Sequence, residues 1–501
     1  EKLKIFTLFK RLSQAVRWVK YPIIPRCHGL DRQRDILLNV VANYLMQGGK
    51  MVSALDTFKR MRKGLDLAQA IAEADRCLLC HDAPCSEGCP ADTQPAEFIR
   101  KFRFKNITGA IRTIKENNIL GGACGVLCPT ARLCEEKCSA MFKSQNRPEG
   151  ADSPIQIGKI QRFLIEHSWD RNIEIFEKPA ARREKVAVVG SGPGGLSCAA
   201  ELAKEGYQVT VFEAKPEPGG VLRYGVVSYR FDMNFLEHEM KDIRALGIKF
   251  QCNSAISGQA DAEKLLRDGF DAVFLAPGLW AAASIKSSSR DIDGLFSSVD
   301  YLSALRDGRF EELERKIKGN TVAVVGGGSV AMDCIESAIR LGAKDVYLIY
   351  RRSYVQMPAE ADERIEALEA GVHFLLLNQP IDYLTDDQHR LTGVKLVRTR
   401  LGEPDASGRR QPENIEGSEW IMDADVVIEA IGNIAPESSP DWYPNVKTDD
   451  KKLIKADSET GKTSVDGIFA GGDIVRGPAL VVQAVQDGKL AARSIMAYLT
   501  K

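Results

Sequence analysis

The chain has 501 residues, of which 44% are hydrophobic and 27% are charged, and its 68 Lys and Arg residues equal its 68 Asp and Glu residues. The length predicts about three domains. The composition is typical of a globular protein and excludes a disordered or fibrous chain, and the zero net charge argues against a nucleic-acid-binding protein. No stretch approaches the roughly 18 apolar residues of a membrane-spanning helix, and no signal peptide is recognisable. We therefore expect a cytoplasmic protein with no nucleic-acid partner and no transmembrane segment.

The first part of the chain, residues 1–70, is predicted to be a basic helical extension. Residues 1–63 contain 14 Lys and Arg residues against 4 Asp and Glu residues. Apolar residues at helical spacing would share one face of a helix, and they are Ile5, Phe9, Leu12, Val16 and Val19. We interpret this face as a docking surface for the rest of the protein or for a partner chain. A helix lying on a membrane surface is the alternative.

Eight of the 12 cysteines lie between Cys77 and Cys138. In a long chain without a secretion signal, such a cluster indicates metal ligation in a reducing compartment and not a disulfide scaffold. The spacings are Cys77-x2-Cys80-x4-Cys85-x3-Cys89-Pro90 and Cys124-x3-Cys128-Pro129-x4-Cys134-x3-Cys138. Zinc sites favour two C-x2-C pairs, whereas a Cys-Pro that serves a second cluster is typical of ferredoxins. Residues 71–178 are therefore predicted to be a helical domain with two [4Fe-4S] clusters. Zinc and unligated thiols are the alternatives.

Beyond residue 179, short β-branched runs alternate with helical stretches. The runs cover residues 186–189, 209–212, 322–325 and 346–349. This alternation predicts parallel sheets with crossover helices. The expected fold class is α/β with an all-α iron–sulfur N-terminal domain and two Rossmann-like nucleotide-binding domains.

A glycine turn follows the first of these runs. Gly190, Gly192 and Gly195 form a G-x-G-x-x-G motif, in which glycines allow a tight turn, close approach of a pyrophosphate and close helix packing. The N-terminus of the following helix would bind the phosphates. Glu213 ends the next strand, where a carboxylate can bind ribose hydroxyls. The alternative is a turn with a purely structural role.

A second copy of the turn starts 136 residues later, with Gly326, Gly328 and Ala331 at the three glycine positions. In place of the acidic residue, the next strand ends at Arg351 and Arg352. Two arginines would bind a 2′-phosphate that a carboxylate would repel. The second site is therefore predicted to favour NADPH over NADH, unless the arginines are only a solvated strand end.

One acidic and one basic nucleotide site suggest a flavin at the first turn and a nicotinamide at the second. Gly220 would let the chain pass against the flavin nucleotide, and Gly472 with Asp473 would meet the ribityl chain and ring near a helix N-terminus. The chain would cross between the two domains after Gly278 and Gly432. We expect an FAD-binding domain of residues 179–283 and 432–501, and an inserted NAD(P)H-binding domain of residues 284–431.

Several motifs resemble one family. Residues 76–85, residues 124–134 and the stretch Ile157-Gly-x-Ile-Gln161 are similar to the N-terminal electron-input half of dihydropyrimidine dehydrogenase and to the separate flavoprotein subunit of the bacterial enzyme. The wider group includes the small subunit of NADPH-dependent glutamate synthase, which residues 401–410 resemble. The resemblance covers the chain from about residue 70 to its end.

The resemblance implies two sets of cluster ligands. The first set comprises Cys77, Cys80, Cys85 and Cys138, and the second comprises Cys89, Cys128, Cys134 and Gln161. Cys124 is then a spare thiol. Counting eight cysteines for two cubes would instead make Cys124 the eighth ligand, so both assignments stay open here.

The same resemblance implies an oxidoreductase that oxidises NAD(P)H at FAD and passes single electrons through the clusters. The cofactors carry this chemistry, so we expect no catalytic side chain. The chain has no room for an FMN-bearing (β/α)8 barrel, so the final acceptor is expected on a partner polypeptide in an oligomer or hetero-complex. Pyrimidine reduction is the leading expectation. A glutamate synthase small subunit is the second, and a redox or scaffold subunit of a larger complex is the third.

Overall fold

The computed structural model describes residues 61, 63–141, 153–177, 179–257, 261–285, 287, 291–404 and 408–500. The apolar helix face expected at Ile5, Phe9, Leu12, Val16 and Val19 lies outside these residues. Within the described ranges, no helix is both long and apolar enough to cross a bilayer.

The N-terminal part of the described chain is helical, as expected. It begins at a capping box, in which the Asp66 side chain accepts from the backbone of Gln69 and the Gln69 side chain accepts from Asp66. The elements are α4 (Leu67–Asp75), α5 (Pro84–Glu87), α6 (Pro95–Arg103), α7 (Ile107–Asn117), α8 (Gly121–Leu127), α9 (Ile157–Asp170) and the 3-10 turns η2 (Thr130–Arg132) and η3 (Ser139–Met141). Helices α4, α6, α7 and α9 pack around their own core, in which Phe98, Ile114 and Leu164 are fully buried.

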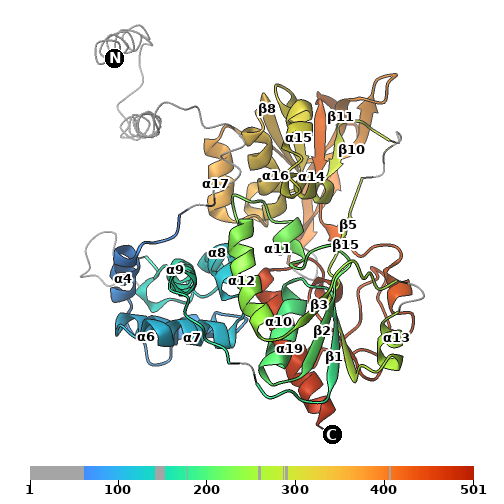
Figure 1. Ribbon diagram of the computed structural model, residues 1–501. Coiled ribbons are helices and arrows are strands. Elements are labelled where there is room, and N and C mark those ends of the chain that lie inside the picture. The colour runs from blue at the N-terminus through green and yellow to red at the C-terminus, as the bar shows by residue number, and fades with distance from the viewer. Residues whose placement is uncertain are drawn as a thin grey trace, which may run out of the picture. The chain divides into compact units, whose positions relative to one another are not determined.

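A five-stranded parallel sheet follows, with strand order β16-β4-β1-β2-β3 (Figure 1). Its strands are β1 (Lys185–Val189), β2 (Gln208–Phe212), β3 (Lys249–Gln251), β4 (Ala272–Leu275) and β16 (Ile468–Ala470). The associated helices are α10 (Pro193–Lys204), α11 (Val221–Tyr224), α12 (Met233–Ala245), α13 (Ala262–Arg267), α18 (Asp473–Arg476) and α19 (Val481–Leu499), with the 3-10 turn η6 (Ser439–Trp442).

Both faces of this sheet are covered, which explains its continuous apolar strands. Val186, Val188 and Val211 pack with residues of α10, α12 and α19 in one core, whereas Ala187 and Val189 pack on the other face. Helices α10 and α19 lie side by side (Figure 1). Their approach requires a glycine, because a Cβ at Gly488 of α19 would lie 2.3 Å from the Gly194 carbonyl oxygen.

The second parallel sheet has the order β6-β14-β7-β8-β9. Its strands are β6 (Leu295–Ser297), β7 (Thr321–Val325), β8 (Asp345–Tyr350), β9 (His373–Leu376) and β14 (Val426–Glu429). Its helices are α14 (Ser298–Arg306), α15 (Phe310–Ile317), α16 (Ser329–Arg340), α17 (Ala361–Glu369) and the 3-10 turn η5 (Tyr354–Gln356). The four strands predicted from the sequence correspond to β1, β2, β7 and β8, which confirms the expected α/β class.

An antiparallel sheet was not expected. It consists of β10 (Asn378–Thr385), β11 (Leu391–Pro404), β12 (Arg410–Asn414) and β13 (Trp420–Asp423), with β11 pairing all three others. Tyr383, Val394 and Leu396 of this sheet pack against Val325 and Val427 of the second parallel sheet. The second sheet is therefore covered by helices on one face and by this antiparallel sheet on the other (Figure 1).

The two segments that connect the parallel sheets run side by side. Strand β5 (Ala281–Ala282) follows β4, strand β15 (Asn433–Ile434) follows β14, and the two pair in antiparallel fashion. Strand β16 then pairs with β4, so the chain returns to the first sheet after it has built the second. This topology agrees with an insertion, while the domain boundaries stay a prediction.

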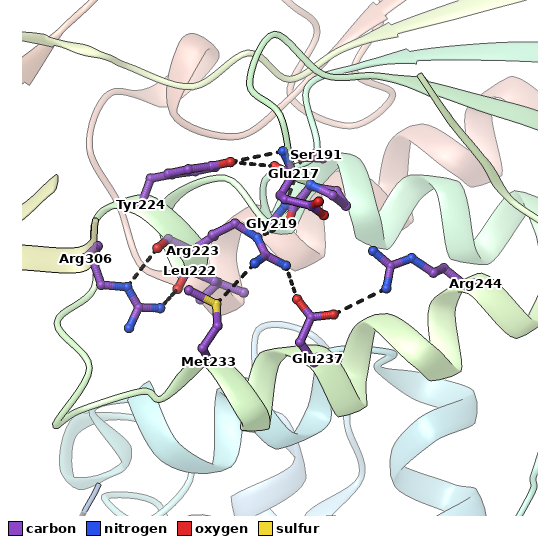
Figure 2. A network of polar contacts seen from close by, with 11 residues as sticks. Ser191, Glu217, Gly219, Leu222, Arg223, Tyr224, Met233, Glu237, Arg244 and Arg306 are labelled. Atoms are coloured by element: carbon purple, nitrogen blue, oxygen red, sulfur yellow. Dashed lines mark hydrogen bonds and ion pairs between the residues drawn. The ribbon is translucent and has the colours of Figure 1, made fainter. Parts of the chain in front are cut away.

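Arg306, the last residue of α14, joins this helix of the second sheet to α11 of the first (Figure 2). Its guanidinium group donates to the carbonyl oxygens of Arg223 at 2.7 Å, Leu222 at 2.8 Å and Phe231 at 2.9 Å, and to the Ser228 hydroxyl at 3.0 Å. Burial, more than the nearby Arg223 charge, lowers the pKa of Arg306 to about 10. The side chain fixes α11 and the segment that follows it onto α14.

We expect Arg306→Ala to destabilise the protein, because it leaves buried carbonyl oxygens without donors. The loss is on the order of 3 kcal/mol, since one bond from a charged donor is worth about 1.5–3 kcal/mol and an unpaired group costs a similar amount. Thermal unfolding should show a Tm lowered by several degrees. Arg309→Ala is the control, because this exposed residue makes only a surface ion pair with Glu312. Equal Tm values for the two variants would contradict this role of Arg306.

Candidate cofactor-binding sites

A first cavity lies in the helical domain and is lined by four cysteines, Cys77, Cys80, Cys85 and Cys138. The loop that carries the first three wraps around the cavity through left-handed backbone at Leu79 (φ 52°) and Ala83 (φ 26°). Burial, and then the neighbouring thiols, raise the pKa of Cys85 to about 11. Four neighbouring thiols lose their protons together only when they bind a cationic group, so the site fits a metal cluster.

A second cavity is lined by Cys89, Cys124, Cys128, Cys134 and Gln161. Burial raises the pKa of the Cys134 thiol. The pKa of Cys128 is raised first by the hydrogen bond between Cys128 and Cys124 and then by burial. The Gln161 side chain is 6% exposed, and its amide nitrogen donates to the Gly121 carbonyl oxygen at 2.6 Å. This bond leaves the amide oxygen as the atom with lone pairs for a metal.

Both candidates for the eighth ligand, Gln161 and Cys124, line this second cavity. The Cys124 sulfur accepts a hydrogen bond from the Asn118 amide at 3.3 Å. The structure therefore brings together every residue of both expected ligand sets, and the choice between Gln161 and Cys124 stays a prediction.

The two cavities fit clusters better than single ions. Within the described ranges, no group of three or more His, Cys, Asp or Glu side chains converges closely enough to hold one metal ion. A tetrahedral zinc ion would require sulfurs about 2.3 Å from one centre. Thiols spaced around a cavity suit a multi-atom iron–sulfur cube, in which each sulfur binds a different iron.

The first glycine turn joins β1 to α10. A Cβ at Gly190 (φ 96°) would lie 2.3 Å from the Ala276 carbonyl oxygen, and one at Gly195 would lie 1.9 Å from the Gly190 carbonyl oxygen. A Cβ at Gly192 would meet nothing within 4 Å. The outer glycines therefore serve packing, and the space at Gly192 is where the backbone can approach a pyrophosphate.

Glu213 directly follows β2 and is 8% exposed. One of its carboxylate oxygens accepts from the Ser191 backbone at 3.1 Å and the other from the Lys215 backbone at 2.8 Å. The Ser191 hydroxyl accepts from the Gly219 backbone at 2.9 Å (Figure 2). A Cβ at Gly220 (φ 53°) would lie 2.5 Å from the Gly192 Cα. The turn, the acidic residue and Gly220 are therefore in contact with one another, and their part in binding FAD stays a prediction.

Gly472 and Asp473 begin α18 at the end of β16. The Gly472 backbone (φ 75°) donates to Asp487 of α19 at 2.8 Å. Burial, partly offset by a bond from the Ala479 backbone, raises the pKa of Asp473 to about 6. Helix α19 begins eight residues after Asp473, at Val481, and Val482 lines the second cysteine cavity. The predicted flavin site and the second cavity thus share one helix.

The second glycine turn joins β7 to α16. A Cβ at Gly326 (φ 138°) would lie 2.2 Å from the Ala430 carbonyl oxygen, while one at Gly328 would meet only Pro358 at 3.8 Å. Ala331 is fully buried in α16. The division between a packed first glycine and an open second glycine is the same as in the first turn, which fits a second nucleotide.

The structure places the two arginines that follow β8 differently. Arg351 is exposed, whereas Arg352 is 7% exposed. The Arg352 guanidinium donates to the Arg410 carbonyl oxygen at 2.9 Å and to the Gln411 side chain at 3.3 Å. Only Arg351 therefore has its side chain in solvent at the end of the strand.

Sequence reasoning missed two buried ionisable side chains that bond to residues adjacent to the second cavity lining. Glu239 of α12 accepts from the Ala123 backbone at 3.0 Å, and burial raises its pKa to about 8. Lys489 of α19 donates to the Ala91 carbonyl oxygen at 2.6 Å, and burial lowers its pKa. The available signal was Glu239 itself, a charge on the apolar face of α12 between Leu236 and Ile243.

Comparison with known proteins identifies both parts of the chain. Residues 54–173 match the family described as dihydropyrimidine dehydrogenase domain II, 4Fe-4S cluster, and residues 184–488 match the pyridine nucleotide-disulphide oxidoreductase family. Among solved structures, FprA from Mycobacterium tuberculosis in complex with NADPH superposes with a TM-score of 0.54 at 20% identity, over 64% of this chain and 85% of that chain. This likeness supports the fold alone.

Three curated relatives are similar over most of the chain. The NADP(+)-dependent formate dehydrogenase subunit beta of Moorella thermoacetica is 37% identical, over 83% of this chain and 60% of its own length. The glutamate synthase [NADPH] small chain of Escherichia coli is 35% identical, over 86% and 92%. The NAD-dependent dihydropyrimidine dehydrogenase subunit PreT of Salmonella typhimurium is 32% identical, over 86% and 94%. The chain belongs to the pyridine nucleotide-disulphide oxidoreductase family and is an oxidoreductase whose flavin and NAD(P)H domains are joined to an N-terminal 4Fe-4S domain.

Proposed function

We propose that this chain is the electron-input subunit of a hetero-complex. It oxidises NADPH at FAD and delivers single electrons through two [4Fe-4S] clusters to an acceptor on another polypeptide. The observation that carries this proposal is the position of α19, which starts beside the predicted flavin site and contributes Val482 to the second cysteine cavity. When bound, the flavin converts the two-electron hydride of a nicotinamide into the one-electron transfers that iron–sulfur clusters accept.

The residues of this chain hold and orient those groups. Gly192 would leave room for the flavin pyrophosphate, Glu213 would bind the ribose, and Asp473, at the start of α18, would face the ribityl chain and ring. Lys489 ties α19 to the loop after Cys89 by its 2.6 Å bond to Ala91, which fixes the distance between flavin domain and second cavity. No side chain is needed as a nucleophile.

We propose that electrons leave this chain for the partner from the cluster in the first cavity, and not from the one in the second cavity. In the first cavity, Cys77, Cys80 and Cys85 are partly exposed, whereas Val482 of the flavin domain lines only the second cavity. A partner that approaches the first cavity can therefore receive electrons without displacing the flavin domain. We assign the complex to the cytoplasm, because the unpaired thiols of the described residues suit a reducing compartment.

For the acceptor, we propose an FMN-containing partner that reduces pyrimidines, as in dihydropyrimidine dehydrogenase. The match of residues 54–173 to domain II of that enzyme supports it. A glutamate synthase is the second candidate, favoured by the 35% identity to a small chain that this sequence covers over 92% of its length. A redox or scaffold subunit is the third, as the relatives include a formate dehydrogenase beta subunit.

The partner is identified by anaerobic co-purification of the full chain from its native cells. We expect an FMN-containing chain in the complex, and NADPH oxidation that depends on uracil or thymine. Oxidation that depends instead on 2-oxoglutarate with glutamine would select the glutamate synthase candidate. A complex without FMN would contradict both and leave the third.

We expect Cys124→Ser to retain both clusters and Cys128→Ser or Gln161→Ala to lose or alter the second one. The reason is the assignment of Gln161, and not Cys124, as the eighth ligand. Iron content, labile sulfide and the EPR signals of the reduced protein measure the outcome. Cys252→Ser is the control, because this thiol lines neither cavity. Loss of a cluster in Cys124→Ser, with Gln161→Ala unchanged, would make Cys124 the ligand.

NADPH should be strongly preferred over NADH, and Arg351→Ala should reduce this preference about 10- to 100-fold. One charge-assisted contact to a phosphate is worth about 1.5–3 kcal/mol. Flavin reduction by each nucleotide in anaerobic stopped-flow experiments gives the two apparent Kd values. Equal Kd values for NADPH and NADH in the unmutated protein would refute the assignment.

A further inference from the structure

The predicted 2′-phosphate site has one exposed arginine, Arg351, at the end of β8, and a second cation has to be sought elsewhere. The sequence supplies Arg351 and Arg352 at the end of β8, but the Arg352 side chain is buried and bonded to the Arg410 carbonyl oxygen at 2.9 Å. A guanidinium group held in this way is directed at the protein. A second cation beside Arg351 would add further charge-assisted hydrogen bonds to the phosphate dianion.

The hairpin of β11 and β12 is bonded to both arginines. The Thr399 hydroxyl of β11 donates to the Arg351 carbonyl oxygen at 2.8 Å, and Arg352 bonds to Arg410, the first residue of β12. Thr399 also pairs with Asn414 of β12. The hairpin therefore packs against the strand end where a 2′-phosphate is expected.

Arg409 and Arg410 lie where the turn of this hairpin leads into β12. The Arg410 guanidinium donates to the carbonyl oxygens of Gly402 at 2.8 Å and Leu401 at 3.0 Å, within the hairpin itself. Arg409 is exposed. Burial, then the Arg352 charge, and then the Arg409 charge lower the pKa of Arg351. Arg409 directly precedes Arg410, whose carbonyl oxygen accepts from Arg352, so the Arg409 charge lies near that of Arg351. An anion between the two guanidinium groups would relieve their repulsion.

We infer that Arg409 is a specificity-determining residue, which binds the 2′-phosphate of NADPH together with Arg351. Arg352 is a positioning residue, because it holds the hairpin that carries Arg409 against the end of β8. This inference rests on the NADPH preference proposed above. It assigns to the β11–β12 hairpin, which has no counterpart in the β-α-β units of the glycine turn, a direct part in nucleotide selection.

The test compares two probes that differ only in the 2′-phosphate, 2′,5′-ADP and 5′-AMP, bound to the FAD-loaded protein and followed by calorimetry. Arg409→Ala should raise the Kd of 2′,5′-ADP at least tenfold and change that of 5′-AMP less than twofold. Arg400→Ala is the matched control on the same hairpin, because its exposed pair with Glu413 is a surface contact. It should leave both Kd values unchanged.

Arg352→Ala has a separate readout. It should weaken 2′,5′-ADP binding and speed amide hydrogen exchange over residues 410–414, whereas Arg409→Ala should weaken binding without altering exchange. If Arg351→Ala lowers the probe ratio and Arg409→Ala does not, the inference about Arg409 is overturned while the NADPH preference stands. If Arg352→Ala weakens binding with unchanged exchange, Arg352 contacts the phosphate itself and the positioning role is overturned. Equal affinity of the unmutated protein for both probes would overturn the NADPH preference as well.

Discussion

A backbone carbonyl oxygen lies against the first glycine of each nucleotide turn, and this contact constrains the rest of the molecule. At Gly190 an added Cβ would lie 2.3 Å from the Ala276 oxygen, and at Gly326 it would lie 2.2 Å from the Ala430 oxygen. Ala276 and Ala430 directly follow β4 and β14, the strands after which the chain crosses between sheets. The strand ends that lie against the nucleotide turns are therefore also the points where the chain leaves each sheet, and β5 and β15 come next along the two crossing segments.

The iron–sulfur domain is joined to this frame through buried polar groups. Lys489 of α19 donates to Ala91, and Glu239 of α12 accepts from Ala123, so each bond reaches a loop or helix that carries cluster cysteines. Buried hydrogen bonds from ionisable side chains are specific in geometry even where their net contribution to stability is small. They hold the second cavity against α19, which is the structural basis of the proposed electron path.

The sequence was most informative where chemistry demands particular residues. The nucleotide turns could be predicted from Gly190 and Gly326, because no side chain fits at these positions. The cluster sites could be predicted from the eight cysteines, because thiols at such spacings have few other uses. Both ligand sets gather at cavities of the described structure. In both cases the residue type and its spacing along the chain were enough for the prediction, without knowledge of the residues that pack against it.

The features that were not predicted from the sequence depend on tertiary packing. The antiparallel sheet of β10–β13 was missed, although β11 runs from Leu391 to Pro404, because its long-range partners are invisible in a local pattern. Arg351 and Arg352 are adjacent and chemically identical, yet the Arg352 side chain bonds to the Arg410 carbonyl oxygen, whereas the Thr399 hydroxyl donates to the Arg351 backbone. Whether Gln161 or Cys124 completes the second site depends on a ligand bond, and both side chains line that cavity.

The most direct test of the account is an anaerobic titration of the isolated, cofactor-loaded protein with NADPH, followed by flavin absorbance and by EPR. We expect the flavin band to bleach and signals of reduced [4Fe-4S] clusters to appear in the same protein, without any partner. Bleaching of the flavin with clusters that stay oxidised throughout, or a protein that contains zinc and no labile sulfide, would contradict it.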